Sequence, residues 1–279
     1  MNNNNQASNW LGLESAVCVI TGAAGGIGAA IASALVEQQA QVVLLDRDAD
    51  GCQALAASLS ETSATEVEAL NCDIADSQSV QRAADWVSER FGSCDVLINN
   101  ASVLQPGSLA DISLASWNRL LEVNLTGYLL CSQAFGRLML ARQSGSIVHI
   151  ASIAAHYPQT FSGAYSAAKA GVAMLSRQIA AEWGPRGIRS NAICPGLIRT
   201  PLSAAFYADP KVEQQRKAMT ANQRIGEPQD IADAVLFLAS PRAAYVNAAE
   251  LTVDGGLESM LMALIPRPGF ESPMASRQA

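Results

Sequence analysis

The sequence is poor in charge, in aromatic residues and in long apolar runs. Charged residues make up 15% of the 279 residues and aromatic residues 5%, whereas 49% are hydrophobic, which excludes a disordered chain. The 18 basic and 25 acidic residues give a net charge of −7, which argues against a nucleic-acid partner. No apolar run approaches the roughly 18–20 residues of a membrane-spanning helix, so we expect no membrane partner.

The six cysteines are scattered along the chain, and none of them has a spacing typical of a metal site or a redox motif. No C-x-x-C pair occurs, and no cysteine stands at ligand spacing from either histidine. Reduced thiols and no metal site are therefore predicted. The first ten residues, MNNNNQASNW, also lack the basic start and apolar stretch of a signal peptide. These absences together predict a cytoplasmic protein.

Short apolar runs alternate with segments of helical length along most of the chain. Each run is nearly continuous in apolar residues, as expected of strands buried on both faces of a parallel sheet. The alternation predicts an α/β fold, a Rossmann-type doubly wound parallel sheet of about seven strands in a single domain with helices on both faces. Strands are expected at 16–21, 41–46, 67–73, 95–100, 146–152, 188–194 and 250–256, and helices at 27–38, 77–91, 116–142, 163–184 and 228–239.

A glycine-rich string, TGAAGGIG at 21–28, joins the first expected strand to the first expected helix. Glycines allow a tight turn and the close approach of a ligand, and the helix N-terminus offers free N–H groups to a pyrophosphate. The second expected strand ends in Asp46, 18 residues after Gly28. An acid there would accept hydrogen bonds from the adenosine ribose hydroxyls, so this context predicts a dinucleotide site.

Asp46 also bears on which dinucleotide binds. A carboxylate placed against the ribose would repel a 2′-phosphate, which favours NAD over NADP. Arg47, the next residue, opposes this because its guanidinium could pair with such a phosphate. The carboxylate carries more weight, and NAD is the predicted cofactor.

A serine, a tyrosine and a lysine follow the fifth expected strand. That strand ends at Ser152, and Tyr165 and Lys169 share one face of the helix expected after it. A lysine ammonium beside a phenol, whose unperturbed pKa is about 10, is expected to lower that pKa. Such a phenol could remove the proton of an alcohol as hydride leaves its carbon, or return it in reduction, while Ser152 holds the substrate oxygen.

Taken together, these residues resemble the short-chain dehydrogenase/reductase family. The resemblance implies an NAD-dependent oxidoreductase that interconverts a secondary alcohol and a ketone. One position departs from the family pattern, because Ser102 stands where the family usually has glycine. The resemblance covers residues 13–256 and rests on TGAAGGIG at 21–28, Asp46, Asp73, NNAS at 99–102, Asn124, Ser152, YSAAK at 165–169 and PGLIRT at 195–200.

The resemblance implies a role for each residue of a catalytic tetrad. Asn124 would hold a proton-relay water through a local distortion of its helix, and Ser152 would orient the substrate. Tyr165 would be the general acid/base, and Lys169 would tune it and bind the nicotinamide ribose. The implied cofactor-binding residues are Gly22, Gly26, Ile27, Gly28, Asp46 and Arg47, then Asp73 and Ile74 at the adenine, Asn100 and Ala101 at its ribose, Tyr165, Lys169, Pro195 and Gly196, and finally Ile198 and Thr200 at the carboxamide.

Two other functions remain as alternatives. The family also contains 3-oxoacyl thioester reductases, which normally prefer NADPH, and a member without catalysis would act as a nucleotide-binding sensor or scaffold. The resemblance further implies a homotetramer or homodimer, in which helices 116–142 and 163–184 pack against a neighbour. His149, inside a strand, is interpreted as a core residue, and His156 could line the pocket, although this is the less favoured interpretation.

The chain is expected to consist of a short lead, one catalytic domain that contains a lid segment, and a C-terminal arm. Residues 1–9 are an Asn-rich lead expected to be disordered, and 10–256 are the dinucleotide-binding and catalytic domain. Residues 197–222 are expected to form a substrate lid, the alternative being a helical excursion packed on the surface. Residues 257–279 are expected to leave the domain as an extended arm, because Pro266 and Pro268 prevent a continuing helix. The arm would close a pocket or an interface, or would cover its own subunit.

Overall fold

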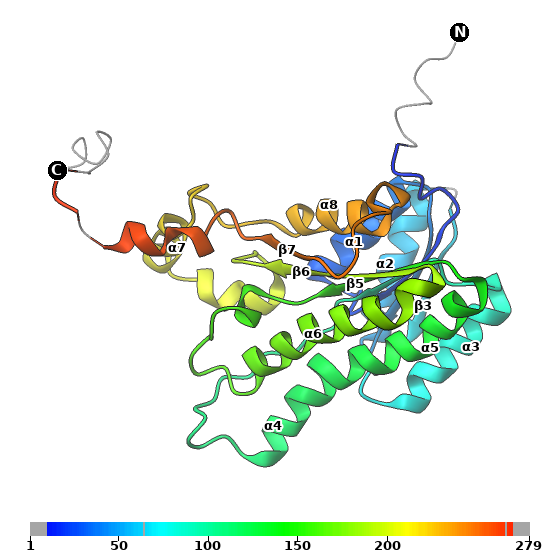
Figure 1. Cartoon of the computed structure of the whole chain (residues 1–279), viewed down its shortest axis with the longest axis horizontal. Helices are drawn as coiled ribbons and strands as arrows, with labels where there is room; N and C mark the ends of the chain where they lie inside the picture. The colour runs from blue at the N-terminus through cyan, green and yellow to red at the C-terminus, as the bar shows by residue number, and fades with distance from the viewer. Residues whose placement is uncertain (1–9, 64, 266, 270–279) are drawn as a thin grey trace, which may run out of the picture.

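The computed structural model describes residues 10–63, 65–265 and 267–269, so the expected lead 1–9 lies outside the described residues. Its seven-stranded sheet has the order β3-β2-β1-β4-β5-β6-β7, and every neighbouring pair is parallel. The predicted fold class is confirmed (Figure 1). The strands are β1 (Val17–Thr21), β2 (Gln41–Asp46), β3 (Val67–Asn71), β4 (Val96–Asn99), β5 (Gly145–Ile150), β6 (Ile188–Pro195) and β7 (Glu250–Val253).

Helices cover both faces of the sheet, as the nearly continuous apolar strands require. The side chains of β1 alternate between two cores, with Cys18 and Ile20 in one and Val17 and Val19 in the other. On the first face lie α1 (Gly26–Glu37), α2 (Ala49–Thr62) and α8 (Pro228–Ala239), and on the second lie α3 (Ser77–Phe91), α5 (Gly127–Arg142) and α6 (Tyr165–Trp183), as Figure 1 shows.

The strand order reverses between β1 and β4, which places a crevice at the carboxyl ends of these two strands. In open α/β sheets this switch point is where ligands bind. Asn100, directly after β4, donates from its side-chain amide to the carbonyls of Thr21 and Gly22 at 3.0 and 2.9 Å. The fold therefore brings the glycine-rich turn and the residues after β4 to one place.

The helix expected at 116–142 is interrupted. The structure divides this stretch into α4 (Leu114–Leu121), a π-helical turn η1 (Glu122–Thr126) and α5. A π-helical turn contains one residue more than an α-helical turn, and so small a change is not visible in the spacing of the apolar residues. The sequence pattern therefore did not predict the break. The sequence pattern also did not predict α2. Asp48 caps the N-terminus of this helix, because its side chain accepts a hydrogen bond from the Gly51 amide.

The expected lid, 197–222, contains no strand but two short helices. Thr200 and Ser203 form a capping box at the start of η4 (Pro201–Tyr207), and Asp209 caps α7 (Pro210–Ala218). Both elements put side chains on the wall of the cavity described below. The segment is thus a helical excursion that also forms part of a pocket.

The expectation of an extended arm from residue 257 is wrong for its first turns. These form a short 3₁₀ helix, η6 (Glu258–Leu264). The Asp254 carboxylate accepts hydrogen bonds from the amides of Gly256 and Glu258, both at 2.7 Å, and so supports the turn that begins this helix. A proline at 266 ends a helix but does not prevent one before it. Pro266 itself lies outside the described residues, as do 270–279.

The remaining short helices are η2 (Ile153–Ala155), η3 (Gly184–Arg186) and η5 (Pro241–Ala243). Within the described residues, a search for helices that could cross a membrane finds none of sufficient length and apolarity. All six cysteines are free and buried, in agreement with the prediction of reduced thiols.

Candidate active site

A cavity of about 640 Å³ opens at the carboxyl ends of the central strands. It extends from Asp46 and the glycine-rich turn to Ser152 and Tyr165, and residues of the segment 197–222 line part of it. Of the sixteen residues predicted to bind the cofactor, all except Gly28 line this cavity. The fold thus gathers around one cavity residues that are spread over 179 positions of the sequence, from Gly22 to Thr200.

Gly28 lies beneath the glycine-rich turn. A Cβ atom there would overlap the carbonyl oxygen of Gly22 and would stand 2.8 Å from the Asn100 amide nitrogen. Gly22 has a φ of +65°, and its own Cβ would lie 2.5 Å from the Cα of Ala101. Both positions therefore require glycine, because the turn packs directly on the strand ends.

The Asp46 carboxylate is fixed by two backbone amides. One oxygen accepts from Ala24 in the glycine-rich turn, and the other from Asp48, each at 3.0 Å. The carboxylate therefore faces the turn that would hold the pyrophosphate, and Arg47 lines the same cavity beside it. A group with ribose hydroxyls fits this end, since an oriented carboxylate accepts their hydrogen bonds.

The Tyr165 side chain is half-buried at the cavity, and its hydroxyl has two serine partners. Ser152 and Ser102 both hydrogen-bond with it and lower its pKa, but burial outweighs them and raises the pKa of Tyr165 above its ordinary value. The protein's own residues thus raise this pKa, whereas a lowering by Lys169 was expected. Its Nζ atom lies 5.7 Å from the centroid of the Tyr165 ring, and burial dominates.

Lys169 is buried and held by two oxygen atoms. Its ammonium nitrogen donates to the carbonyl of Ile150 at 2.8 Å and to the hydroxyl of Tyr128 at 3.2 Å. Burial lowers the pKa of Lys169 to about 7. A lysine in this state changes protonation near neutral pH, which suits a group that receives or releases a proton next to Tyr165.

Asn124 lies in the π-helical turn η1, so the predicted distortion of its helix is present. The side chain is buried beside the cavity and is absent from its wall. Its amide nitrogen donates to the Val103 carbonyl at 2.8 Å, and its oxygen accepts from the Val103 amide and from Ser102 Oγ at 2.9 and 3.0 Å. The side chain thus fixes the loop that carries Ser102.

The sequence analysis missed two contacts of this site. Ser102 was noted as a departure from the family pattern, but the structure makes it a link between Asn124 and Tyr165. Tyr128 was not singled out, although it stands one helical turn after Asn124, which places the two side chains on the same side of the helix. His149 is a buried core residue, as expected, and burial lowers its pKa to about 3. His156 does not line the cavity.

Comparisons with known proteins identify relatives of this chain. A family model described as Enoyl-(Acyl carrier protein) reductase matches residues 22–258. The chain is 41% identical over 244 residues to D-threitol dehydrogenase of Mycolicibacterium smegmatis, covering 88% of this chain and 93% of the relative. It is 42% identical over 244 residues to cis-4-hydroxycyclohexanecarboxylate dehydrogenase of Sinomonas cyclohexanicum, covering 86% and 95%.

Solved structures extend the same likeness. A gluconate 5-dehydrogenase from Burkholderia cenocepacia, in complex with NADP and tartrate, is 32% identical, with a TM-score of 0.86 and coverage of 91% of this chain and 99% of that one. Levodione reductase is also 32% identical, with a TM-score of 0.85 and coverage of 88% and 99%. The chain belongs to the short-chain dehydrogenase/reductase family and is an oxidoreductase that acts on CH–OH groups.

Proposed function

We propose that this protein is an NAD-dependent dehydrogenase that interconverts a secondary alcohol and a ketone, with Tyr165 as the general acid/base. The observation that carries the proposal is the Tyr165 hydroxyl with Ser152 and Ser102 as partners, in the same cavity as the glycine-rich turn and Asp46. The nicotinamide ring supplies the hydride acceptor or donor when bound. Holding the substrate oxygen and moving the proton fall to side chains of this chain.

The proton is handled by Tyr165 and its neighbours. In reduction the phenol, kept protonated by its raised pKa, donates to the substrate oxygen, and in oxidation the phenolate takes the alcohol proton. Ser152 holds the substrate oxygen at hydrogen-bond distance from the phenol. Lys169, whose pKa is about 7, stands behind Tyr165 and exchanges a proton near neutral pH. Asn124 keeps Ser102 in place.

The substrate end of the cavity carries the lid side chains. Phe206 and Tyr207 line it, and the Arg216 guanidinium lies over both rings, at 5.3 and 5.2 Å from their centroids. This wall favours a substrate with an apolar or cyclic body and a polar or anionic group. A panel of polyols, cyclic alcohols and hydroxy acids, followed by NADH absorbance, tests the function. No turnover with any alcohol or ketone would favour a nucleotide-binding protein without catalysis, and activity confined to 3-oxoacyl thioesters with NADPH would favour the reductase.

Cofactor choice tests the role of Asp46. We expect a kcat/KM preference for NAD over NADP of at least about tenfold, which corresponds to about 1.4 kcal/mol. Asp46→Ala should erode this preference because it removes the carboxylate that repels a 2′-phosphate. Arg47→Ala is the matched control, and it should leave the use of NAD unchanged. Equal use of both cofactors by the wild-type enzyme would instead assign the dominant role to Arg47.

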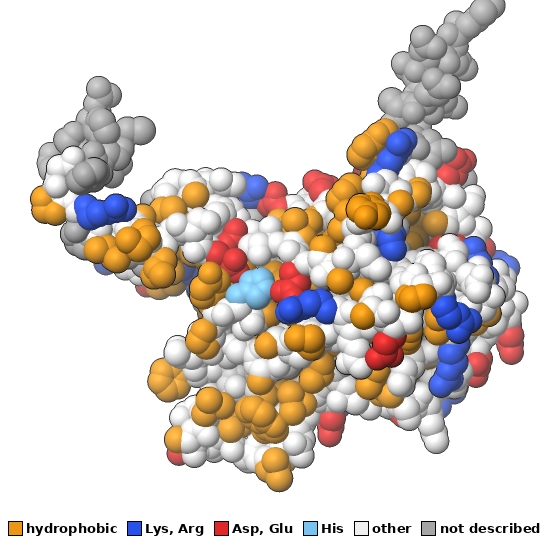
Figure 2. Space-filling model, in the orientation of Figure 1, with side chains coloured by type: hydrophobic (Ala, Val, Ile, Leu, Met, Phe, Trp, Pro, Cys, Tyr) orange, Lys and Arg blue, Asp and Glu red, His pale blue; other side chains and the backbone are white. Residues whose placement is uncertain are grey.

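We also propose a homotetramer or homodimer in the cytoplasm. Hydrophobic side chains gather over the surface of α4 to α6 in Figure 2, and Leu114, Leu129 and Met174 on these helices are exposed in one subunit. A symmetric partner is the usual means of burying such a surface. Light scattering at micromolar concentration should give a multiple of 29.2 kDa, and a monomer would refute the assembly.

The C-terminal arm, 257–279, is proposed to complete a substrate pocket or an interface. The chain entering it contacts the end of the lid, where the Asn222 amide donates to the Gly255 carbonyl at 3.0 Å, and Leu261 and Met262 are exposed. Deleting 257–279 should raise KM for the alcohol and leave NAD affinity unchanged. Unchanged substrate kinetics would contradict the pocket role, and dissociation of the assembly would assign the arm to packing.

A further inference from the structure

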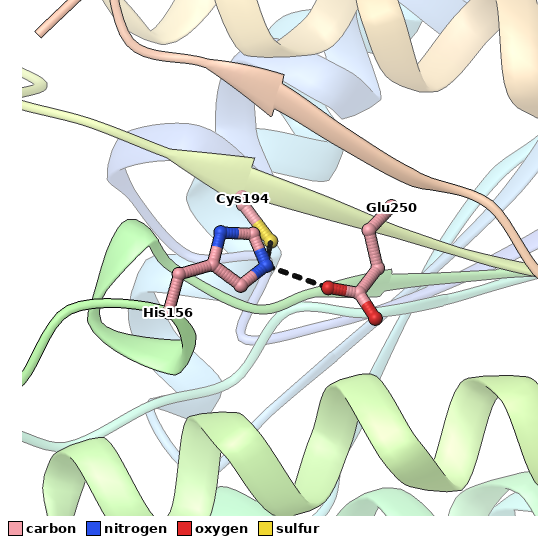
Figure 3. Close-up of side chains that lie close together, drawn as sticks. All are labelled: His156, Cys194 and Glu250. Atoms are coloured by element: carbon pink, nitrogen blue, oxygen red, sulfur yellow. Dashed lines mark hydrogen bonds and ion pairs between the residues drawn. The ribbon is translucent and has the colours of Figure 1, made fainter. Parts of the chain in front are cut away.

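His156, Cys194 and Glu250 come together in the fold (Figure 3), and none of the three lines the cavity. His156 follows η2, Cys194 is near the end of β6, and Glu250 begins β7. His156 Nε2 lies 2.6 Å from a carboxylate oxygen of Glu250 and 3.9 Å from Cys194 Sγ. The three candidate ligand atoms all lie within 4.8 Å of one another.

The donor set is that of a zinc site. Zinc binds imidazole nitrogen, thiolate sulfur and carboxylate oxygen, and three protein ligands plus water complete a tetrahedron. A thiolate among the ligands disfavours magnesium and calcium, which take oxygen ligands. The present 2.6 Å contact is that of an ion pair, so the Glu250 carboxylate must turn slightly to admit an ion.

Two further side chains orient these ligands as the outer partners of metal sites do. Glu258 Oε1 lies 3.1 Å from Nδ1 of His156, so the imidazole presents Nε2 toward Cys194 and Glu250. Arg177 lies 2.6 Å from the other carboxylate oxygen of Glu250. A carboxylate on the distal nitrogen of a histidine ligand is the usual arrangement around protein-bound zinc.

Charge and access also suit a divalent cation. Cys194 is buried, but the side chains of His156 and Glu250 are 30% and 16% exposed, and Figure 2 shows the histidine at the surface between acidic side chains. When Cys194 is a thiol and His156 an imidazolium, the charges of Glu250, Glu258 and Arg177 bring the net charge of the cluster to zero. Replacing the thiol proton and the imidazolium proton by one divalent ion keeps it neutral.

We propose that His156 Nε2, Cys194 Sγ and a carboxylate oxygen of Glu250 bind one zinc ion outside the catalytic cavity. Zn–N, Zn–S and Zn–O bonds form, the S–H and N–H bonds break, and two protons pass to solvent. The residues are 38 and 56 positions apart, so the spacing pattern that predicted no metal site cannot detect them. The Ser152 backbone also hydrogen-bonds with Cys194, so the ion would brace the turn that carries Ser152.

The test uses the full-length protein, stripped with a chelator and titrated with Zn²⁺ or Co²⁺. We expect one equivalent of metal per chain and, with Co²⁺, a thiolate charge-transfer band in the near ultraviolet. Cys194→Ser should abolish the band, and His156→Gln should weaken Zn²⁺ binding by at least about tenfold. Glu258→Gln should weaken it by about 10–100-fold through the outer contact. Cys131→Ser, at a buried cysteine elsewhere, is the matched control and should change neither.

The exposed position of His156 makes its variant a safe second measurement if Cys194→Ser fails to fold. A Co²⁺ spectrum without a charge-transfer band would overturn the proposal, as would Zn²⁺ binding that His156→Gln and Glu250→Gln leave unchanged. In either case the cluster is an ion-pair network only. These results are independent of turnover, so they do not depend on the proposed dehydrogenase activity.

Discussion

Replacing Tyr165 by phenylalanine is expected to lower kcat by about 10²–10⁴-fold, the usual contribution of a general acid/base. The substitution removes the transferable proton and keeps the half-buried ring, so NADH affinity should remain close to that of the wild type. Single-turnover kinetics measure the first effect, and fluorescence titration of NADH the second.

Tyr157→Phe is the matched control for this variant. Tyr157 is an exposed phenol that does not line the cavity, and its loss should leave turnover unchanged. If Tyr165→Phe retains more than a tenth of the wild-type turnover, the phenol does not transfer the proton. Proton transfer would then have to be assigned to another residue of the cavity, with Lys169, 5.7 Å from the centroid of the Tyr165 ring, as the first candidate.

Gly28→Ala is expected to cost about 1–3 kcal/mol of the free energy of unfolding, as overpacking of a tight site does. The new methyl group would overlap the Gly22 carbonyl and crowd the Asn100 amide, so the turn and the residue after β4 must both shift. Because these groups line the end of the cavity proposed to bind the nucleotide, NADH affinity should fall at least about tenfold. Urea unfolding and nucleotide titration measure the two effects.

The control is Gly25→Ala in the same turn. Gly25 has an extended backbone, and a Cβ atom there would meet no atom within 4 Å. The free energy of unfolding of the Gly25→Ala variant should therefore stay near the wild-type value. Wild-type stability and nucleotide affinity in Gly28→Ala would show that the turn tolerates a side chain, and the steric argument for glycine at this position would fail.

The fold was readable from the sequence because its signals are local. A strand buried on both faces must be continuously apolar, and a turn that places backbone against a phosphate must be rich in glycine. The residues at 16–21 therefore predict a buried strand, and TGAAGGIG at 21–28 predicts such a turn. Where an element depends on its neighbours, the prediction was less accurate. The break at η1 and the helix η6 are both invisible in the apolar pattern.

The protonation of the site also depended on the surroundings. The positions of Tyr165 and Lys169 on one helix face predicted a lysine that tunes a phenol, because spacing reports proximity. It does not report burial, and burial raises the pKa of Tyr165 and lowers that of Lys169 to about 7. The partners of Tyr165 come from separate loops, so Ser102 gained its role only once the chain was folded.

The sequence by itself determined the sheet, the glycine-rich turn and the types of residue at the active site, because each follows from periodicity or from a short motif. Tertiary structure alone decided which residues meet: Ser102 with Tyr165, and His156 with Cys194 and Glu250. The reason is physical. Parallel strands deliver their carboxyl ends to one edge of the sheet, so contacts there join residues that are far apart in sequence.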